Sequence, residues 1–380
     1  MRKTVITKAM AAVVITMVGV MFSAVPRLPA QQIKEAEALL GFDPIELIGS
    51  QEKLGRSDLT AQHEGLTYLF VSEENRRLFL GDPQRYGVQM GGLCARLGRT
   101  TGGDQDLYMV HEGRIYIFAS STCVDFFEAA PEKYLEPDPP ASLRETASPG
   151  ELRRGRELIA RAVDGLGGAA AVDGLATLVE RVTVMRPTAQ GEVAAGQAAI
   201  LDFAGERFRR ERQIPSGTLA DVSVDGQGWW RSPGGAEVFS PAQAANLARE
   251  MVIANPAYIL RMRDRDAFIA AAAGDPAAAG AAEARVEVEL DGDYRWTLTI
   301  DSASGTISRI AFVDRGPEGD WGTVEHILSD YRRAGGLDWP HRRVVTFNGE
   351  GVPYWGTRTA SLETNVELDA VLFERPAELR

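Results

Sequence analysis

The sequence predicts an α+β protein in two parts, a small duplicated module followed by a long antiparallel sheet with helices. Residues 63–86 and 111–134 match at nine of 24 positions without a gap, which indicates an internal repeat. Residues 138–150 are rich in proline, serine and acidic residues, which is typical of a linker. From residue 151 to residue 380 the chain alternates strand-like segments with turn signals. We therefore place the module at 31–137 and the sheet domain at 151–380.

Each copy of the repeat predicts a hairpin strand followed by a helix. His-Glu-Gly opens both copies, and the Tyr and Phe two residues apart that follow have the period of a strand. Ser72 and Ser120 stand where a helix N-cap is expected. Pro83 and Pro131 come where those helices must end. The repeat therefore predicts two small units that bury their aromatic faces together.

The second part reads as a meander with helices at its start and middle. An amphipathic helix is predicted over 151–168 and a helical excursion over 241–260, with strands before and after the excursion. Asp-Gly at 291–292 and Asn-Gly at 348–349 predict hairpin turns. The alanine-rich segment 271–285 predicts a flexible surface loop, with a gating loop over a cavity as the alternative.

The charge balance excludes several classes of partner. The formal net charge is −12, and residues 1–30 contain four basic residues and no acidic one. A body this acidic argues against binding nucleic acid or anionic lipid surfaces. No nucleophile elbow, zinc-protease helix motif or phosphate-binding loop is present in the sequence. The sequence therefore predicts a protein that is not an enzyme and that does not bind nucleic acid.

The N-terminus has the layout of a secretory signal. Arg2, Lys3 and Lys8 precede an apolar run over 9–25, and small residues follow near residue 30. We expect residues 1–30 to be a signal peptide and the remaining chain to be exported, to a bacterial periplasm. An uncleaved membrane anchor is the alternative.

Two cysteines and two histidines gather in the repeat region. Cys94 and Cys123 would close a disulfide loop of about 30 residues, worth roughly 3 kcal/mol, which is what an exported chain favours. With His63 and His111 they would instead offer thiolate and imidazole ligands, which suit copper or zinc. Free thiols are the third alternative. A disulfide and a metal site on the same thiols exclude each other, so a periplasmic metal-binding or thiol redox protein remains an alternative function.

The tryptophans point to the second part for ligand binding. All six lie between residues 229 and 355. Trp229, Trp230 and Trp296 are candidates for lining an apolar groove, and Arg231 is a candidate for meeting a polar headgroup. The alternatives are that these tryptophans are ordinary core and that Arg231 is a solvated surface charge.

The first part resembles the YHS domain family. The matching pieces are GFDPIEL at 41–47, YLFVSEENRRLFLGDPQRY at 68–86 and GGLCA at 91–95, where Leu93 replaces the aromatic residue of many exported members. The resemblance covers the scaffold of the module and implies a metal-binding ancestry.

The second copy resembles the related TRASH-type metal module, in which Cys-x-x-x-Cys precedes a helix. Cys123 stands at the second cysteine position and Ala119 at the first, while the first copy has Val71 and Asn75 there. The metal-ligand positions are thus mostly replaced.

The second part resembles the LolA-like outer-membrane lipoprotein-sorting proteins. The similarity is carried by DGQGWW at 225–230, the helix SPAQAANLARE at 240–250 and the segments 298–314, 330–349 and 368–376. The resemblance implies a half-barrel whose concave face is plugged by helices and can hold acyl chains.

The function predicted from the sequence is a non-catalytic, exported binding protein. Its half-barrel would hold an apolar or lipid ligand, and its YHS-like module would act as a docking or metal-responsive element toward an envelope protein partner. A structural envelope protein without a ligand is the remaining alternative.

Overall fold

The computed structural model describes residues 36–188, 191–274, 282–351 and 353–379. The chain divides into two compact units. The first comprises the described residues up to Ala95 together with Gly102–Glu128, and the second comprises Arg96–Thr101 and the chain from Ala129 onward. The predicted signal segment, residues 1–30, lies outside the described residues. No helix in the described ranges is long and apolar enough to cross a membrane.

The first unit is built from short strands and short helices. Its elements are β1 (Ala36–Glu37), η1 (Ala38–Gly41), α1 (Pro44–Ile48), β2 (Arg56–His63), β3 (Leu66–Phe70), α2 (Glu73–Gly81), α3 (Pro83–Tyr86), η2 (Gln89–Gly92), β4 (Asp104–His111), β5 (Arg114–Phe118) and α4 (Ser121–Ala129). The strands form one sheet in the order β1-β3-β2 and a second sheet of β4 and β5.

The two hairpins of the repeat have the same register. His63 pairs with Leu66 and His111 pairs with Arg114. Each hairpin has a two-residue turn, Glu64-Gly65 in the first and Glu112-Gly113 in the second. All four residues have positive φ, as this kind of turn requires. Both hairpins also shift register near the start of their first strand. The predicted hairpin–strand–helix unit is therefore present twice.

The aromatic positions shared by the copies form the core of the first unit. Phe79 is fully buried and lies 4.6 Å from Tyr68 and 5.2 Å from Phe70, between ring centroids. Phe127 makes the matching contacts with Tyr116 and Phe118, both at 5.2 Å. The identities between the copies thus specify packing.

The second unit contains one long antiparallel sheet with helices. Its elements are η3 (Pro131–Lys133), α5 (Leu143–Thr146), α6 (Pro149–Leu166), α7 (Ala169–Asp173), β6 (Thr177–Thr188), β7 (Gly191–Asp202), β8 (Arg207–Ile214), β9 (Gly217–Val224), β10 (Gln227–Ser232), β11 (Gly235–Val238), α8 (Pro241–Val252), α9 (Pro256–Arg261), η4 (Met262–Asp264), β12 (Phe268–Ala273), β13 (Glu283–Leu290), β14 (Tyr294–Asp301), β15 (Ile307–Arg315), β16 (Trp321–Ala334), β17 (Leu337–Phe347), β18 (Trp355–Thr364), η5 (Ala370–Phe373) and η6 (Ala377–Leu379).

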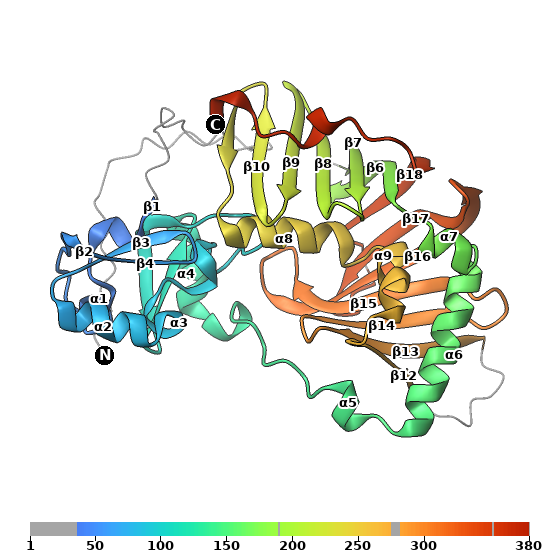
Figure 1. Ribbon diagram of the computed structural model, residues 1–380, viewed down its shortest axis with the longest axis horizontal. Helices are drawn as coiled ribbons and strands as arrows, with labels where there is room; N and C mark the ends of the chain where they lie inside the picture. The colour runs from blue at the N-terminus through green and yellow to red at the C-terminus, as the bar shows by residue number, and fades with distance from the viewer. Residues whose placement is uncertain (1–35, 189–190, 275–281, 352, 380) are drawn as a thin grey trace. The chain divides into compact units, whose positions relative to one another are not determined.

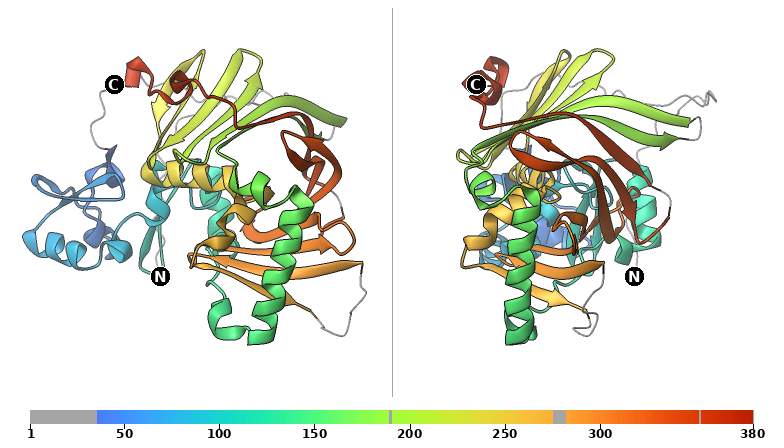
Figure 2. Two further views of the ribbon diagram at one scale, coloured as in Figure 1. Left: turned by 45° about the vertical axis from the view of Figure 1, so that its right-hand side comes forward. Right: turned by 90° about the vertical axis from the view of Figure 1, so that its right-hand side faces the viewer.

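The sheet consists of two meanders, which are joined by the strands that come first and last along the chain of this unit. The strand order is β11-β10-β9-β8-β7-β6-β18-β17-β16-β15-β14-β13-β12, so β6 pairs with β18 in the middle. Figure 1 shows α8 and α9 between the arm that carries β6–β10 and the arm that carries β12–β15. The turned views of Figure 2 show the sheet curving around these helices. This large antiparallel sheet with a few helices is consistent with the predicted half-barrel.

Helix α6 lies very close to neighbouring backbone at two of its three glycines, Gly155 and Gly165. A Cβ on Gly155 would overlap the backbone of Ala270 in β12, and one on Gly165 would overlap the backbone at Gly305. The helix starts at a capping box formed by Ser148 and Glu151 and ends at Gly167. It runs over 149–166, two residues ahead of the range predicted from the sequence.

Two segments differ from their predictions. Within the predicted linker 138–150, α5 is fixed to the sheet, because Glu289 accepts hydrogen bonds from Ser142 Oγ at 2.7 Å and from the Leu143 amide at 2.8 Å. The first residues of the predicted loop 271–285 belong to β12 and the last to β13. Repeated alanine hid this strand, because alanine has no strong strand propensity. Residues 275–281 lie outside the described residues.

Candidate functional site

The two neighbouring tryptophans of β10 lie on opposite faces of the sheet. Trp229 pairs with Val222, and Trp230 pairs with Asp221. Because side chains alternate along a strand, these two rings cannot line one groove. Trp229 is buried and Trp230 is half-buried.

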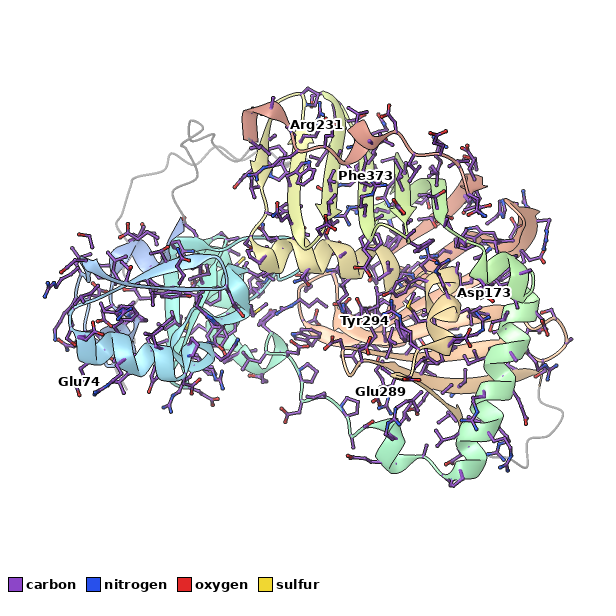
Figure 3. All side chains as sticks on the ribbon, viewed as in Figure 1. Glu74, Asp173, Arg231, Glu289, Tyr294 and Phe373 are labelled. Carbon is purple, nitrogen blue, oxygen red and sulfur yellow. The ribbon has the colours of Figure 1, made fainter. Side chains whose placement is uncertain are left out.

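The face that carries Trp229 is covered by the C-terminal segment. One row of cross-strand partners, Val179, Ile200, Arg209, Val222 and Trp229, runs across five strands. Phe373 packs on the apolar members of this row, and its place on the C-terminal segment is labelled in Figure 3. Arg209 Nη1 donates to the carbonyl of Leu372 at 2.8 Å. Trp229 therefore helps to hold the C-terminus and does not face an open groove.

Of the other two candidate ligand residues, Trp296 lies apart and Arg231 lies on the same face of β10 as Trp229. Trp296 is in the main core, where its Nε1 donates to the Ile253 carbonyl at 2.7 Å and its ring stacks on Tyr294 at 5.3 Å. Arg231 is an exposed residue of β10 (Figure 3). Trp229 and Arg231 share one face of β10, Trp230 takes the other face and Trp296 lies in the core, so the four predicted residues are not assembled into one site.

A pocket of about 260 Å³ lies where α8 and α9 face the sheet. Its lining comes from the β7–β8 turn, the β9–β10 turn, α8, α9 and the start of β14. Ten of its fourteen lining residues are apolar, aromatic or glycine: Phe203, Phe208, Gly226, Ala244, Ala245, Ala248, Val252, Tyr258, Met262 and Tyr294. The other four, Glu206, Ser223, Asp225 and Arg265, are polar. Tyr294, labelled in Figure 3, lies on β14 below α8 and α9. This is the concave, mostly apolar lining that small-molecule sites have.

The sheet face that supports this pocket is the one opposite Trp229. A second row of cross-strand partners, Leu178, Leu201, Phe208, Ser223 and Gly228, runs one residue out of phase with the first. Gly228 allows α8 to approach, since a Cβ there would come within 3.0 Å of the Ala244 Cβ. Phe208 and Ser223 of this row line the pocket.

Two helix caps and the indole of Trp296 hold α8 and α9, the helices that line the pocket, in place. Ser240 and Gln243 form a capping box at the start of α8, and the Asn255 side chain accepts from the amides of Ala257 and Tyr258 to cap α9. The hydrogen bond from Trp296 holds the residue between the helices, Ile253. Ala244, Ala248 and Val252 recur every four residues, so they share the face of α8 that lines the pocket.

The tyrosines of the pocket are held in the neutral form. Burial raises the pKa of Tyr258 to about 12, and burial also raises the pKa of Tyr294. The guanidinium of Arg249 lies 6.0 Å from the centre of the Tyr294 ring, where its charge acts in the opposite direction. The two tyrosines therefore add no charge to the lining, whose charged residues are Glu206, Asp225 and Arg265.

A buried ionic network fixes α8 to the sheet. Arg210 on β8 contacts Asp221 on β9 at 2.9 Å and Glu250 on α8 at 2.7 Å. Arg212 makes a second contact with Asp221 at 2.6 Å. The two carboxylates raise the pKa of Arg210 although its burial alone would lower it. Such a network resists separation of its partners, because breaking it leaves a buried charge.

A second pocket, about 540 Å³ in volume, lies between α6 and β12. Six of its fourteen lining residues carry charge: Arg144, Arg156, Asp164, Arg263, Asp264 and Asp266. It is larger than the first pocket, but its charged lining makes it less suited to an apolar ligand.

The predicted metal ligands occupy packed positions. His63 lies edge-on to Phe79 at 6.2 Å, and His111 lies edge-on to Phe127 at 5.8 Å, so the matched histidines have matched packing roles. Cys94 and Cys123 are buried thiols that no disulfide joins in this structure. Over the described ranges, no three His, Cys, Asp or Glu side chains come together as a metal site. The four-ligand set of His63, His111, Cys94 and Cys123 is therefore not assembled, and a copper or zinc role remains a prediction.

The pocket residues were missed by the reasoning from sequence. The one available signal was the recurring alanine face of the helix at 241–252, which marks a close approach or a space beside a helix. The tyrosines at 258 and 294 could not be joined to it, because their proximity depends on the pairing of distant strands.

Comparison with solved structures finds similar arrangements at low identity. A domain assigned as an outer membrane lipoprotein-sorting protein from Vibrio parahaemolyticus has a TM-score of 0.41 and 12% identity, over 60% of this chain and 100% of that one. A LolA superfamily protein from Nitrosomonas europaea has a TM-score of 0.40 and 10% identity, over 58% and 97%. A DUF1329 family protein from Desulfovibrio piger has a TM-score of 0.41 and 12% identity, over 59% and 97%.

No family model matches the chain, and no curated protein matches it. The predicted YHS resemblance thus has no matching model. At the identities given above, the solved structures identify neither a ligand nor a partner for this chain. The envelope protein partner and the docking role of the first unit remain predictions.

Proposed function

We propose that this protein is an exported carrier that binds a single apolar chain, such as the acyl chain of a lipid, in the pocket between α8–α9 and the sheet. The observation that carries the proposal is the lining of that pocket, in which Phe203, Phe208, Tyr258 and Tyr294 surround the alanine face of α8. A volume of about 260 Å³ is slightly below the range of about 300 to 1,000 Å³ that is common for drug-sized ligands, so it suits one slim chain.

The energetics support an apolar occupant. Each methylene moved from water into such a lining contributes about 0.8 kcal/mol. The polar residues Glu206, Asp225 and Arg265 give a headgroup a place to stay hydrated while the chain is buried. Export is supported by the basic residues and the apolar run of residues 1–25. The described part of the chain offers no cluster that supports metal-based chemistry.

The test is to fill the pocket. Ala248→Phe places a ring in the lining, and we expect it to weaken binding of a fluorescent long-chain fatty acid by about tenfold or more. Ala160→Phe is the matched control, because Ala160 lines the charged pocket beside α6. Both variants are compared with the parent protein by fluorescence titration and by mass spectrometry of co-purified lipid.

The proposal fails if the parent protein takes up no fatty acid and carries no lipid. It also fails if Ala160→Phe reduces binding and Ala248→Phe, folded as shown by circular dichroism, does not. In that case the apolar pocket is not the binding site.

A further inference from the structure

The structural repeat of the first unit is longer than the sequence repeat. Each copy begins with a short helical turn, η1 or η2, that contains left-handed residues in succession. Leu39 and Leu40 have φ of 55° and 52°, and Met90 and Gly91 have φ of 59° and 58°. The amides of Phe42 and Leu93 then donate to the carbonyls of Leu39 and Met90, at 3.0 Å and 3.1 Å. A conformation this uncommon in non-glycine residues indicates that the two turns are equivalent.

Further contacts fix the alignment of the two copies. The amide of Gly55 donates to the Gly41 carbonyl at 2.8 Å, and the amide of Gly103 donates to the Gly92 carbonyl at 2.9 Å. Phe42 forms an isolated antiparallel β-bridge with Leu54, and Leu93 forms one with Gly102. Residues 39–43 therefore match 90–94, while residues from 54 onward match those 48 positions later. The segment with α1 in the first copy is three residues longer, which hides this match from a comparison without gaps.

This alignment pairs Asp43 with Cys94 and Asn75 with Cys123. In the first copy, Asn75 Nδ2 donates to Asp43 Oδ2 at 2.9 Å. The backbone amide of Asn75 donates to Ser72 Oγ at 3.1 Å, and in the second copy the amide of Cys123 donates to Ser120 Oγ at 3.3 Å. The backbone of the two copies matches around both positions. The sulfurs of Cys94 and Cys123 therefore occupy the places that two touching side chains, Asp43 and Asn75, take in the first copy.

The surroundings of the two sulfurs favour a neutral product over a charged one. Cys94 and Cys123 are at most 2% exposed, and Phe118, Val124 and Phe127 close to them in sequence are buried as well. Copper(I) held by two thiolates would bury a net negative charge, and zinc needs further ligands, whereas the described residues supply no third one. A disulfide is neutral and apolar, so burial does not oppose it.

We propose that Cys94 and Cys123 are a paired thiol site that forms one intramolecular disulfide within the second copy. The step is thiol–disulfide exchange with a small disulfide, R–S–S–R. The Cys94 and Cys123 thiols each lose a proton and together two electrons, an S–S bond forms between them, and two R–SH molecules leave. The bond ties the segment after η2 to the start of α4, where the first copy uses the hydrogen bond between Asp43 and Asn75.

The experiment uses the full-length mature chain. The protein is refolded from denaturant in a mixture of oxidised and reduced glutathione, so that burial does not limit access. We expect the folded monomer to lack both thiols, and peptide mapping to find Cys94 linked to Cys123. Reduction should lower the melting temperature of the first unit by on the order of 10 °C, and Cys94→Ser or Cys123→Ser should abolish that difference.

The first copy supplies a matched control. In a Cys94→Ser, Cys123→Ser background, the pair Asp43→Cys and Asn75→Cys should form the same kind of link, while Asp43→Cys with Arg77→Cys should not. The proposal is overturned if refolded parent protein keeps both thiols under oxidising conditions, or forms only intermolecular links. Two thiols that bind one copper ion and form no disulfide would equally overturn it.

Discussion

A buried carboxylate of the first unit and a half-buried one of the second accept hydrogen bonds over very different distances along the chain. In the first unit, fully buried Asp43 accepts from the amides of Ile45 and Glu46, from the amide of Val71 and from Asn75 Nδ2. These donors lie 2 to 32 residues away. In the second unit, Glu180 accepts from Trp339 Nε1 at 2.8 Å and from Thr359 Oγ1 at 2.7 Å, from 159 and 179 residues away.

The glycines show the same contrast. Gly65 and Gly113 serve turns that are complete within one hairpin. In contrast, Gly155 in helix α6 leaves room for the backbone of Ala270, which lies on strand β12 far along the chain. These features of the first unit thus depend on contacts over short stretches of chain, and those of the second on contacts that exist only once its sheet is complete.

The largest effect is expected at the contact between α6 and β12. Gly155→Leu should lower the free energy of unfolding of the second unit by more than about 3 kcal/mol, because the new side chain would overlap backbone that cannot move aside. Gly150→Leu is the control in the same helix, since the nearest atom to a Cβ there is 3.9 Å away. Denaturant unfolding and hydrogen exchange over residues 149–379 measure the effect. Since leucine favours a helix more than glycine does, equal losses in both variants, or no loss in Gly155→Leu, would show that the close approach to β12 is not what Gly155 provides.

A smaller, local effect is expected at Asp43. Asp43→Ala should cost the first unit about 2 to 3 kcal/mol, because the α1 cap is lost and the Val71 amide and Asn75 side chain lose their acceptor. Asp82→Ala is the control, because that exposed cap serves α3 through the Arg85 amide. It should cost about 0.5 kcal/mol.

Hydrogen exchange localises the loss of protection in Asp43→Ala. We expect faster exchange over residues 36–95 and 102–128 and no change over 149–379. Faster exchange over residues 149–379 as well would contradict the view that the first unit depends on contacts of its own.

The smallest effect is a pH dependence of the second unit. His326 on β16 packs against Phe312 and Trp355, at 5.5 Å and 5.7 Å between ring centroids. Burial lowers its pKa well below the ordinary 6.5, and the charges of Arg343 and Arg99 lower it further. The unfolded chain then takes up the proton first as the pH falls. Stability should therefore decrease below about pH 6.5, by up to about 1.4 kcal/mol for each pH unit until the folded state also binds the proton.

His326→Leu removes this titration, so its stability should depend less on pH between 6.5 and 5 than that of the parent protein. His341→Gln, a substitution on the neighbouring strand β17, should keep the parent dependence. Urea unfolding at several pH values measures both. An unchanged slope in His326→Leu would assign the pH dependence to other groups.

Much of the fold follows from patterns that span a few residues. The turns of the hairpins, the caps at Ser72 and Ser120 and the helix expected over 151–168 appear in the structure near their predicted places. The strand β12 was missed, because an alanine run has neither alternation nor β-branched residues. The ligand candidates on β10 are divided between two faces for a different reason: a step of one residue moves a side chain to the other face of the sheet.

The division into two parts, the repeat and the antiparallel character of the second unit follow from the sequence, because each depends on local patterns and turn chemistry. Three further features follow only from the folded chain. These are the pairing of β6 with β18, the covering of Trp229 by the C-terminal segment, and the pocket of Tyr258 and Tyr294 beside α8. The physical reason is that each of these joins residues through the curvature of one sheet, and no local signal reports which distant strands will meet.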